Sequence, residues 1–121
     1  MMKLIQDRFN CPCCGWLGLS SPSYAHIGEQ PWGDQGTPPY EERLGLPSYE
    51  VCACCGFEFG NDDNPGTSSP TSFSEYLLDW IKSGCSWFDE TKKPSDWNLE
   101  RQLKSVGIKQ PTCTANGCSR C

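Results

Sequence analysis

Two short runs decide how this sequence is expected to fold: NCPCCGW at residues 10–16 and VCACCGF at residues 51–57. Each contains a Cys-x-x-Cys-Gly pattern, in which two thiolates can face one metal ion and the glycine supplies a positive φ. We call residues 11–15 the first cysteine turn and residues 52–56 the second. The pattern selects four metal ligands, which are Cys11, Cys14, Cys52 and Cys55. We therefore predict that the two turns converge on one metal ion.

Four thiolates favour a soft or borderline metal, so the predicted cofactor is one Zn²⁺ per chain, with iron less favoured. Four protein ligands leave no open position for a water molecule, so the ion is expected to stabilise the fold rather than to catalyse hydrolysis. Cys13 and Cys54 occupy equivalent places in the two turns. We predict that they are buried residues outside the site, with a redox pair or a further metal ligand as alternatives.

The other four of the ten cysteines are Cys85, Cys113, Cys118 and Cys121. They could form a second metal site, although Cys118 and Cys121 lack the following glycine that marks the two turns. A thiol-bearing tail at residues 110–121 is the favoured interpretation, and the sequence leaves the second site open.

The first ten residues contain no apolar run long enough for a signal peptide, and no window elsewhere could span a membrane. We therefore expect a cytoplasmic protein, in which reduced thiols favour metal binding over disulfides. Residues 1–81 carry three basic and eleven acidic side chains, a formal charge of −8, and residues 82–121 carry seven basic and four acidic, giving +3. This balance disfavours nucleic acid as a partner and favours a basic protein.

A chain of 121 residues is expected to form one domain, here residues 1–109. A short apolar run at Trp16–Leu19 follows the first cysteine turn, and apolar residues recur with period two on both sides of the second turn. These patterns predict that each cysteine turn lies at the tip of a hairpin. Residues 20–47 are rich in proline and glycine and predict a long surface loop.

Two helices are predicted after the second turn, over residues 72–84 and 96–106. Ser72 and Glu75 form a capping box for the first helix, which should end at Gly84. Its apolar stripe consists of Phe73, Leu77, Trp80 and Ile81. The second helix is expected to have Ser95 as its N-cap and Gly107 as its C-terminal stop. Its stripe consists of Leu99, Leu103 and Val106.

Aromatic and acidic residues outside the turns have a structural and a functional interpretation. In the long loop, packing that pins the chain is favoured over a binding role for Tyr24, Trp32 and Tyr40. Asp62 and Asp63 are expected in a solvated loop rather than in a Ca²⁺ site. The residues predicted for the core or its edges near the helices are Trp80, Trp87, Phe88 and Trp97.

The sequence contains the stretches CPCCG, YEVCACCGFEFG, SFSEYLLDWIKSGCSWF and KKPSDWNLERQLKSVGI. In this combination they resemble the small bacterial cysteine-rich proteins named for their CPCC motif. The resemblance covers most of residues 9–109. It implies metal binding by Cys11, Cys14, Cys52 and Cys55, and it implies an immunity role for similar acidic proteins that are encoded beside toxins. Residues 49–73 also resemble part of a rubredoxin and of a zinc ribbon, which implies a possible iron site.

These observations predict an α+β protein in which zinc-ribbon or rubredoxin-like knuckle hairpins are covered by two C-terminal helices. The predicted function is a non-enzymatic, zinc-stabilised bacterial interaction protein, and its sharpest version is an immunity-type protein that neutralises a basic toxin. A rubredoxin-like electron carrier and a zinc-ribbon nucleic-acid binder are the alternatives. Catalysis has little support, because His26 is the only histidine.

Overall fold

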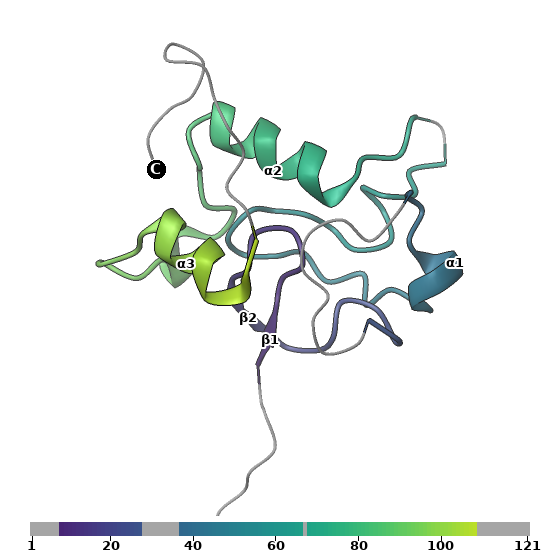
Figure 1. Cartoon of the computed structure of the whole chain (residues 1–121), viewed down its shortest axis with the longest axis horizontal. Helices are drawn as coiled ribbons and strands as arrows, with labels where there is room; N and C mark the ends of the chain where they lie inside the picture. The colour runs from purple at the N-terminus through teal and green to yellow at the C-terminus, as the bar shows by residue number, and fades with distance from the viewer. Residues whose placement is uncertain (1–7, 28–36, 67, 109–121) are drawn as a thin grey trace, which may run out of the picture.

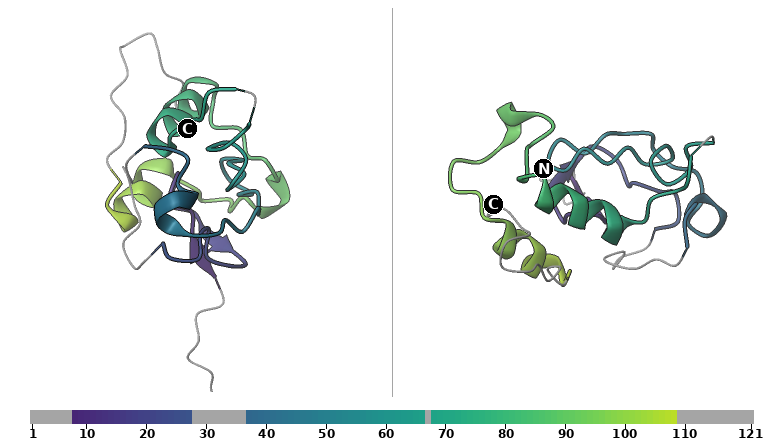
Figure 2. Two further views of the ribbon diagram at one scale, coloured as in Figure 1. Left: turned by 90° about the vertical axis from the view of Figure 1, so that its right-hand side faces the viewer. Right: turned by 90° about the horizontal axis from the view of Figure 1, so that it is seen from above.

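The computed structural model describes residues 8–27, 37–66 and 68–108. These residues form a mixed α+β structure with the elements β1 (Phe9–Asn10), β2 (Leu17–Leu19), α1 (Glu41–Leu44), α2 (Phe73–Lys82), the 3-10 helix η1 (Glu90–Lys92) and α3 (Leu99–Val106). Figure 1 shows α1 and α3 at opposite ends of the molecule. The loop that carries the second cysteine turn lies between α2 and the β1–β2 hairpin, and the views in Figure 2 agree with this order.

The first cysteine turn joins the two strands of a short antiparallel hairpin, as predicted. Phe9 pairs with Leu19 and Asn10 with Leu17, so that Gly18 is an extra residue in β2 and forms a bulge. The second cysteine turn differs from the prediction, because the residues flanking it make only the isolated bridge between Val51 and Glu58.

The backbone on both sides explains why no regular strands flank the second turn. Tyr49 has a φ of 62° and Gly60 has a φ of 97°. Positive φ values lie outside the extended region, so the chain leaves the strand conformation on either side of the bridge.

Helix α2 begins with the predicted capping box. The Ser72 hydroxyl accepts from the Glu75 N–H, and the Glu75 carboxylate accepts from the Ser72 N–H. The helix ends at Lys82, with Ser83 as its C-cap. The predicted stripe is buried and consists of Phe73, Leu77, Trp80 and Ile81. This face of α2 therefore covers the loop that carries the second turn.

Helix α3 begins later than predicted. Its N-cap is Asn98, whose side chain accepts from the Arg101 N–H, and Ser95 is not the cap. The Trp97 N–H donates to the Pro94 carbonyl at 3.2 Å, so these residues form a separate turn before the helix. Gly107 ends the helix in the left-handed conformation, as predicted.

The long loop is fixed by its aromatic residues. Tyr24 and Tyr40 are completely buried. The Tyr40 ring stacks on Phe73 with 4.2 Å between ring centroids, and Tyr24 meets Phe59 edge-on at 6.0 Å. The packing interpretation is therefore confirmed for these two tyrosines, whereas Trp32 lies outside the described residues. The short helix α1, inside this loop, was not predicted.

The prediction of a solvated acidic loop is wrong for Asp63, which is completely buried. One carboxylate oxygen accepts from the Tyr40 N–H at 3.0 Å, and the other accepts from the Gly60 N–H at 2.8 Å. In this loop, backbone N–H groups point into the protein, where water cannot accept from them. The buried Asp63 carboxylate supplies the acceptors that these N–H groups would otherwise lack. Burial, followed by the charge of Asp63, raises the pKa of Tyr24 far above its usual value.

Asp63→Asn is expected to lower the free energy of unfolding by about 2 kcal/mol, because the new NH₂ group cannot accept one of the two buried N–H groups. Chemical denaturation of the metal-loaded protein measures this. The matched control is Asp62→Asn, which is expected to cost less because Asp62 is only partly buried. Equal costs for the two variants would argue against the buried role of Asp63.

The tryptophans near the C-terminal helices form a chain of edge-on contacts. Trp87 lies 6.0 Å from Trp16 and 5.5 Å from Trp97, measured between ring centroids. Trp80 and Trp87 are buried and Trp97 is partly buried, as predicted, but Phe88 is 66% exposed. The Phe88 N–H donates to the Cys54 carbonyl at 3.1 Å, which ties this segment to the second cysteine turn while the Phe88 side chain stays exposed.

Candidate metal centre

The first cysteine turn is closed by two backbone hydrogen bonds. The Cys11 N–H donates to the Trp16 carbonyl at 2.8 Å, and the Gly15 N–H donates to the Cys11 carbonyl at 2.7 Å. Gly15 has a φ of 86°, which a residue with a side chain rarely adopts. The turn therefore places Cys11 and Cys14 on the same side of the chain.

The second cysteine turn repeats this pattern. The Cys52 N–H donates to the Phe57 carbonyl at 3.0 Å, and the Gly56 N–H donates to the Cys52 carbonyl at 2.8 Å. Gly56 has a φ of 87°. The two similar sequences thus form two similar local structures, and each presents a pair of cysteines.

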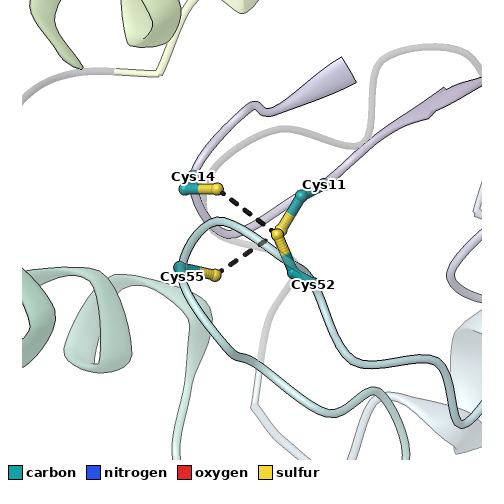
Figure 3. A group of neighbouring side chains, drawn as sticks. All are labelled: Cys11, Cys14, Cys52 and Cys55. Atoms are coloured by element: carbon teal, nitrogen blue, oxygen red, sulfur yellow. Dashed lines mark hydrogen bonds between the residues drawn. The ribbon is translucent and has the colours of Figure 1, made fainter. Parts of the chain in front are cut away.

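The structure brings the four predicted ligands together. Figure 3 shows Cys11, Cys14, Cys52 and Cys55 pointing toward a common centre, with the two turns facing each other. The Sγ atoms of Cys11 and Cys55 are 3.9 Å apart, and those of Cys14 and Cys52 are 3.8 Å apart. All four sulfurs lie within 4.8 Å of one another, and all four residues are buried.

These separations fit a tetrahedral metal ion. Four sulfurs at metal bonds of about 2.3 Å would be about 3.8 Å from one another. The donor set contains sulfur only, which suits thiophilic metals and disfavours Mg²⁺ and Ca²⁺. The four cysteines can therefore hold one metal ion in a closed coordination sphere.

The two remaining cysteines of the turns lie outside this group. The Cys13 thiol donates to the Phe73 carbonyl at 3.4 Å, and the Cys54 sulfur accepts from the Gln102 side chain at 3.6 Å. Both residues are buried. Among the described residues, the group that could hold a metal consists of Cys11, Cys14, Cys52 and Cys55. Cys13 and Cys54 are therefore buried cysteines outside the site, as predicted.

Burial has the largest effect on the thiol pKa values. It raises the pKa of Cys14, Cys52 and Cys55 above the ordinary value of 9.0. Burial acts in the same direction on Cys11, but hydrogen bonds from the four surrounding thiols outweigh it and lower the Cys11 pKa. The metal-free centre thus holds most of its protons at neutral pH, and metal binding must displace them.

Acid is therefore expected to release the metal. The bound state carries fewer protons than the free state, so each displaced proton lowers the apparent affinity about tenfold per pH unit. Competition with a chelator at several pH values measures this trend, and a pH-independent affinity would contradict it.

Two other sequence candidates, Cys85 and His26, lie in the described residues and do not join this centre. Cys113, Cys118 and Cys121 lie outside the described residues. Cys85 is buried and disulfide-bonded, so the expectation of reduced thiols is wrong for this residue, and its sulfur is not a thiolate that could join a second metal site. His26 is exposed and lies beside Gly45 at the end of α1, on a different part of the fold from the cysteines. The residues that the structure describes therefore offer no second cysteine group for a metal.

Gln102 is a contact of the centre that the sequence did not indicate. It lies on α3 between Leu99 and Val106 of the predicted apolar stripe, at positions i+3 and i−4 from them. These spacings place its side chain on the face of α3 that turns toward the protein. A polar residue on the apolar face of a helix is the one feature of the sequence that could have pointed to a buried contact for Gln102.

Comparison with known proteins gave no family model, no curated protein and no solved structure that matches the chain. The resemblance to the CPCC proteins therefore stays a prediction from the quoted motifs. Within the described residues, no helix has the length and apolar character needed to cross a bilayer.

Proposed function

We propose that this chain is a zinc-stabilised, non-enzymatic protein of the bacterial cytoplasm, related to the CPCC proteins, that acts by binding another protein. The observation that carries the proposal is the group of four buried cysteine sulfurs at tetrahedral spacing. Zinc is the usual metal of such a set in cells, and a closed site of this kind stabilises a fold. We regard the two turns as zinc-ribbon-like knuckles.

The surface supports a role in protein binding. Tyr24 and Tyr40 are buried, so they cannot form an exposed aromatic loop. The large apolar side chains that are exposed in the described residues are Leu17, Leu46, Tyr49 and Phe88. Phe88 and Leu17 line one open groove together with Trp16 and Val51. Exposed aromatic side chains held by a rigid backbone are common at protein interfaces.

The sharpest form of the proposal is an immunity-type protein that neutralises a basic toxin. The charge of −8 over residues 1–81 supports a basic partner, because opposite charges accelerate association. Capture from the native host tests this, with the metal-loaded chain as bait and a Phe88→Ala chain as the matched control. A basic protein that is captured by the wild type, and whose activity the chain blocks, would support the proposal. Failure to recover any protein with these properties would contradict it.

The same four sulfurs suit iron, so a rubredoxin-like electron carrier is the second candidate. Colour separates the two, because Fe³⁺ bound by four thiolates is red and Zn²⁺ is colourless. An iron-containing chain with a reversible one-electron reduction would favour the electron carrier.

A further inference from the structure

The side chain of Gln102 touches both cysteine turns. Its Nε2 donates to the carbonyl of Cys14 at 3.0 Å and toward the Sγ of Cys54 at 3.6 Å. Cys14 belongs to the first turn and Cys54 to the second. One carboxamide on α3 therefore connects two segments that are far apart in the sequence.

The orientation of the carboxamide follows from its third contact. The indole Nε1 of Trp97 donates to Oε1 of Gln102 at 2.9 Å. An indole nitrogen can only donate, so Oε1 must face Trp97 and the NH₂ group must face the cysteines. Trp97 thus holds Gln102 in the orientation in which it can donate to both turns.

The backbone of α3 is also close to the first turn. A Cβ atom added to Gly15 would lie 2.9 Å from Cγ2 of Val106 and 3.2 Å from the Gln102 carbonyl oxygen. Such a contact is tighter than carbon atoms normally make, so glycine lets the helix approach. Leu99 and Leu103 are buried on the same helix, and they hold α3 in place independently of the Gln102 amide.

An open groove of about 580 Å³ lies between α3 and the first cysteine turn, and Gln102 is one of its lining residues together with Trp16, Trp97 and Val106. Cys14 itself is completely buried. Gln102 therefore stands between the solvent in this groove and the backbone of a metal-ligating cysteine.

We propose that Gln102 is a positioning residue of the metal centre, which clamps the two cysteine turns together and slows the release of the metal. This inference rests on the proposed metal binding. For the ion to leave, at least one pair of thiolates must move away from the other pair. The hydrogen bonds of Gln102 hold the two turns at the observed separation, so this movement first has to break them.

Zinc transfer from the loaded protein to a chromogenic chelator tests the clamp. Gln102→Met keeps a side chain of similar length without the amide, and is expected to release zinc about thirtyfold faster, the effect of losing two hydrogen bonds of ordinary strength. Gln102→Glu keeps the acceptor for Trp97 but places a carboxylate beside the thiolates, and is expected to release zinc faster still. The cobalt-substituted forms should keep the absorption of a tetrahedral four-sulfur site, because the ligands are unchanged.

The matched control is Val106→Ala, which weakens the packing of α3 on the same turn but leaves the amide in place. Its release rate is expected to stay within about twofold of the wild type, since a valine-to-alanine change in a partly buried position has a modest effect. Release from Gln102→Met at the wild-type rate, or equally fast release from Val106→Ala, would overturn the clamp. A wild-type chain that holds no metal would instead overturn the proposed function, and the clamp with it.

Discussion

Cys14→Ser is expected to abolish metal retention and to unfold most of the domain. A serine hydroxyl is a poor ligand for a thiophilic metal, and three thiolates alone leave the coordination sphere open. Structural zinc contributes on the order of 10 kcal/mol in small domains, which is comparable to the whole stability of an ordinary domain. Elemental analysis and circular dichroism of the purified variant measure the two effects.

Cys13→Ser is the matched control, because it makes the same chemical change at the neighbouring position. Cys13 is as buried as Cys14, but its thiol donates to the Phe73 carbonyl rather than lying in the four-sulfur group. A serine hydroxyl can donate to the same carbonyl, so this variant is expected to keep its metal and to lose about 1 kcal/mol or less. Loss of the metal from both variants, or from Cys13→Ser alone, would show that the ligands have been assigned wrongly.

Phe73→Ala is expected to lower the free energy of unfolding by about 4 kcal/mol, within the usual range for a buried phenylalanine. Phe73 is 1% exposed and stacks on Tyr40, and its ring also meets Phe57 edge-on at 5.2 Å between centroids. Removing it leaves a cavity among rings that hold the long loop against α2. Urea denaturation of the metal-loaded protein measures the loss.

Phe88→Ala is the control for this second prediction. Phe88 is 66% exposed, so its removal leaves no cavity and is expected to change the stability by about 0.5 kcal/mol or less. If the two phenylalanine variants were equally destabilised, the aromatic cluster around Phe73 would not be the core that the structure indicates. If the Phe73 variant lost its metal without unfolding, the cluster and the metal centre would be coupled more tightly than their separate contacts suggest.

The features that could be predicted from the sequence are those that depend on nearby residues. A cysteine turn needs two cysteines and a following glycine, and all of these lie within five positions, as in residues 11–15. The capping box of α2 is equally local, since Ser72 and Glu75 bond to each other's backbone. That the two turns should meet was inferred from the chemistry of a four-thiolate site, and the structure places their sulfurs together.

The features that could not be predicted depend on residues far apart in the chain. Asp63 looks like a residue of a polar loop, and only the folded chain brings the Tyr40 N–H to its carboxylate. Ser95 and Asn98 are both acceptable N-caps, and the turn formed by Trp97 and Pro94 decides between them. Gln102 acquires its role only because α3 lies against the first cysteine turn.

The metal centre and the aromatic cluster are adjacent parts of one core. Phe73 belongs to the cluster, and its carbonyl accepts from Cys13 in the first turn. Phe57 follows the second turn directly and contacts Phe73. A small domain would gain from this arrangement, because a metal bound by the four cysteines would fix the turns to which the aromatic residues are attached.

The central claim is that four cysteines hold one zinc ion, and the most direct test is the metal content of the chain purified without added metal. Elemental analysis with an independent protein determination should give one zinc per chain, no iron and a colourless sample, and the zinc should be absent from Cys14→Ser. A red, iron-containing protein would replace the structural zinc site with an electron carrier. A wild-type chain that is folded and contains no metal would contradict the account.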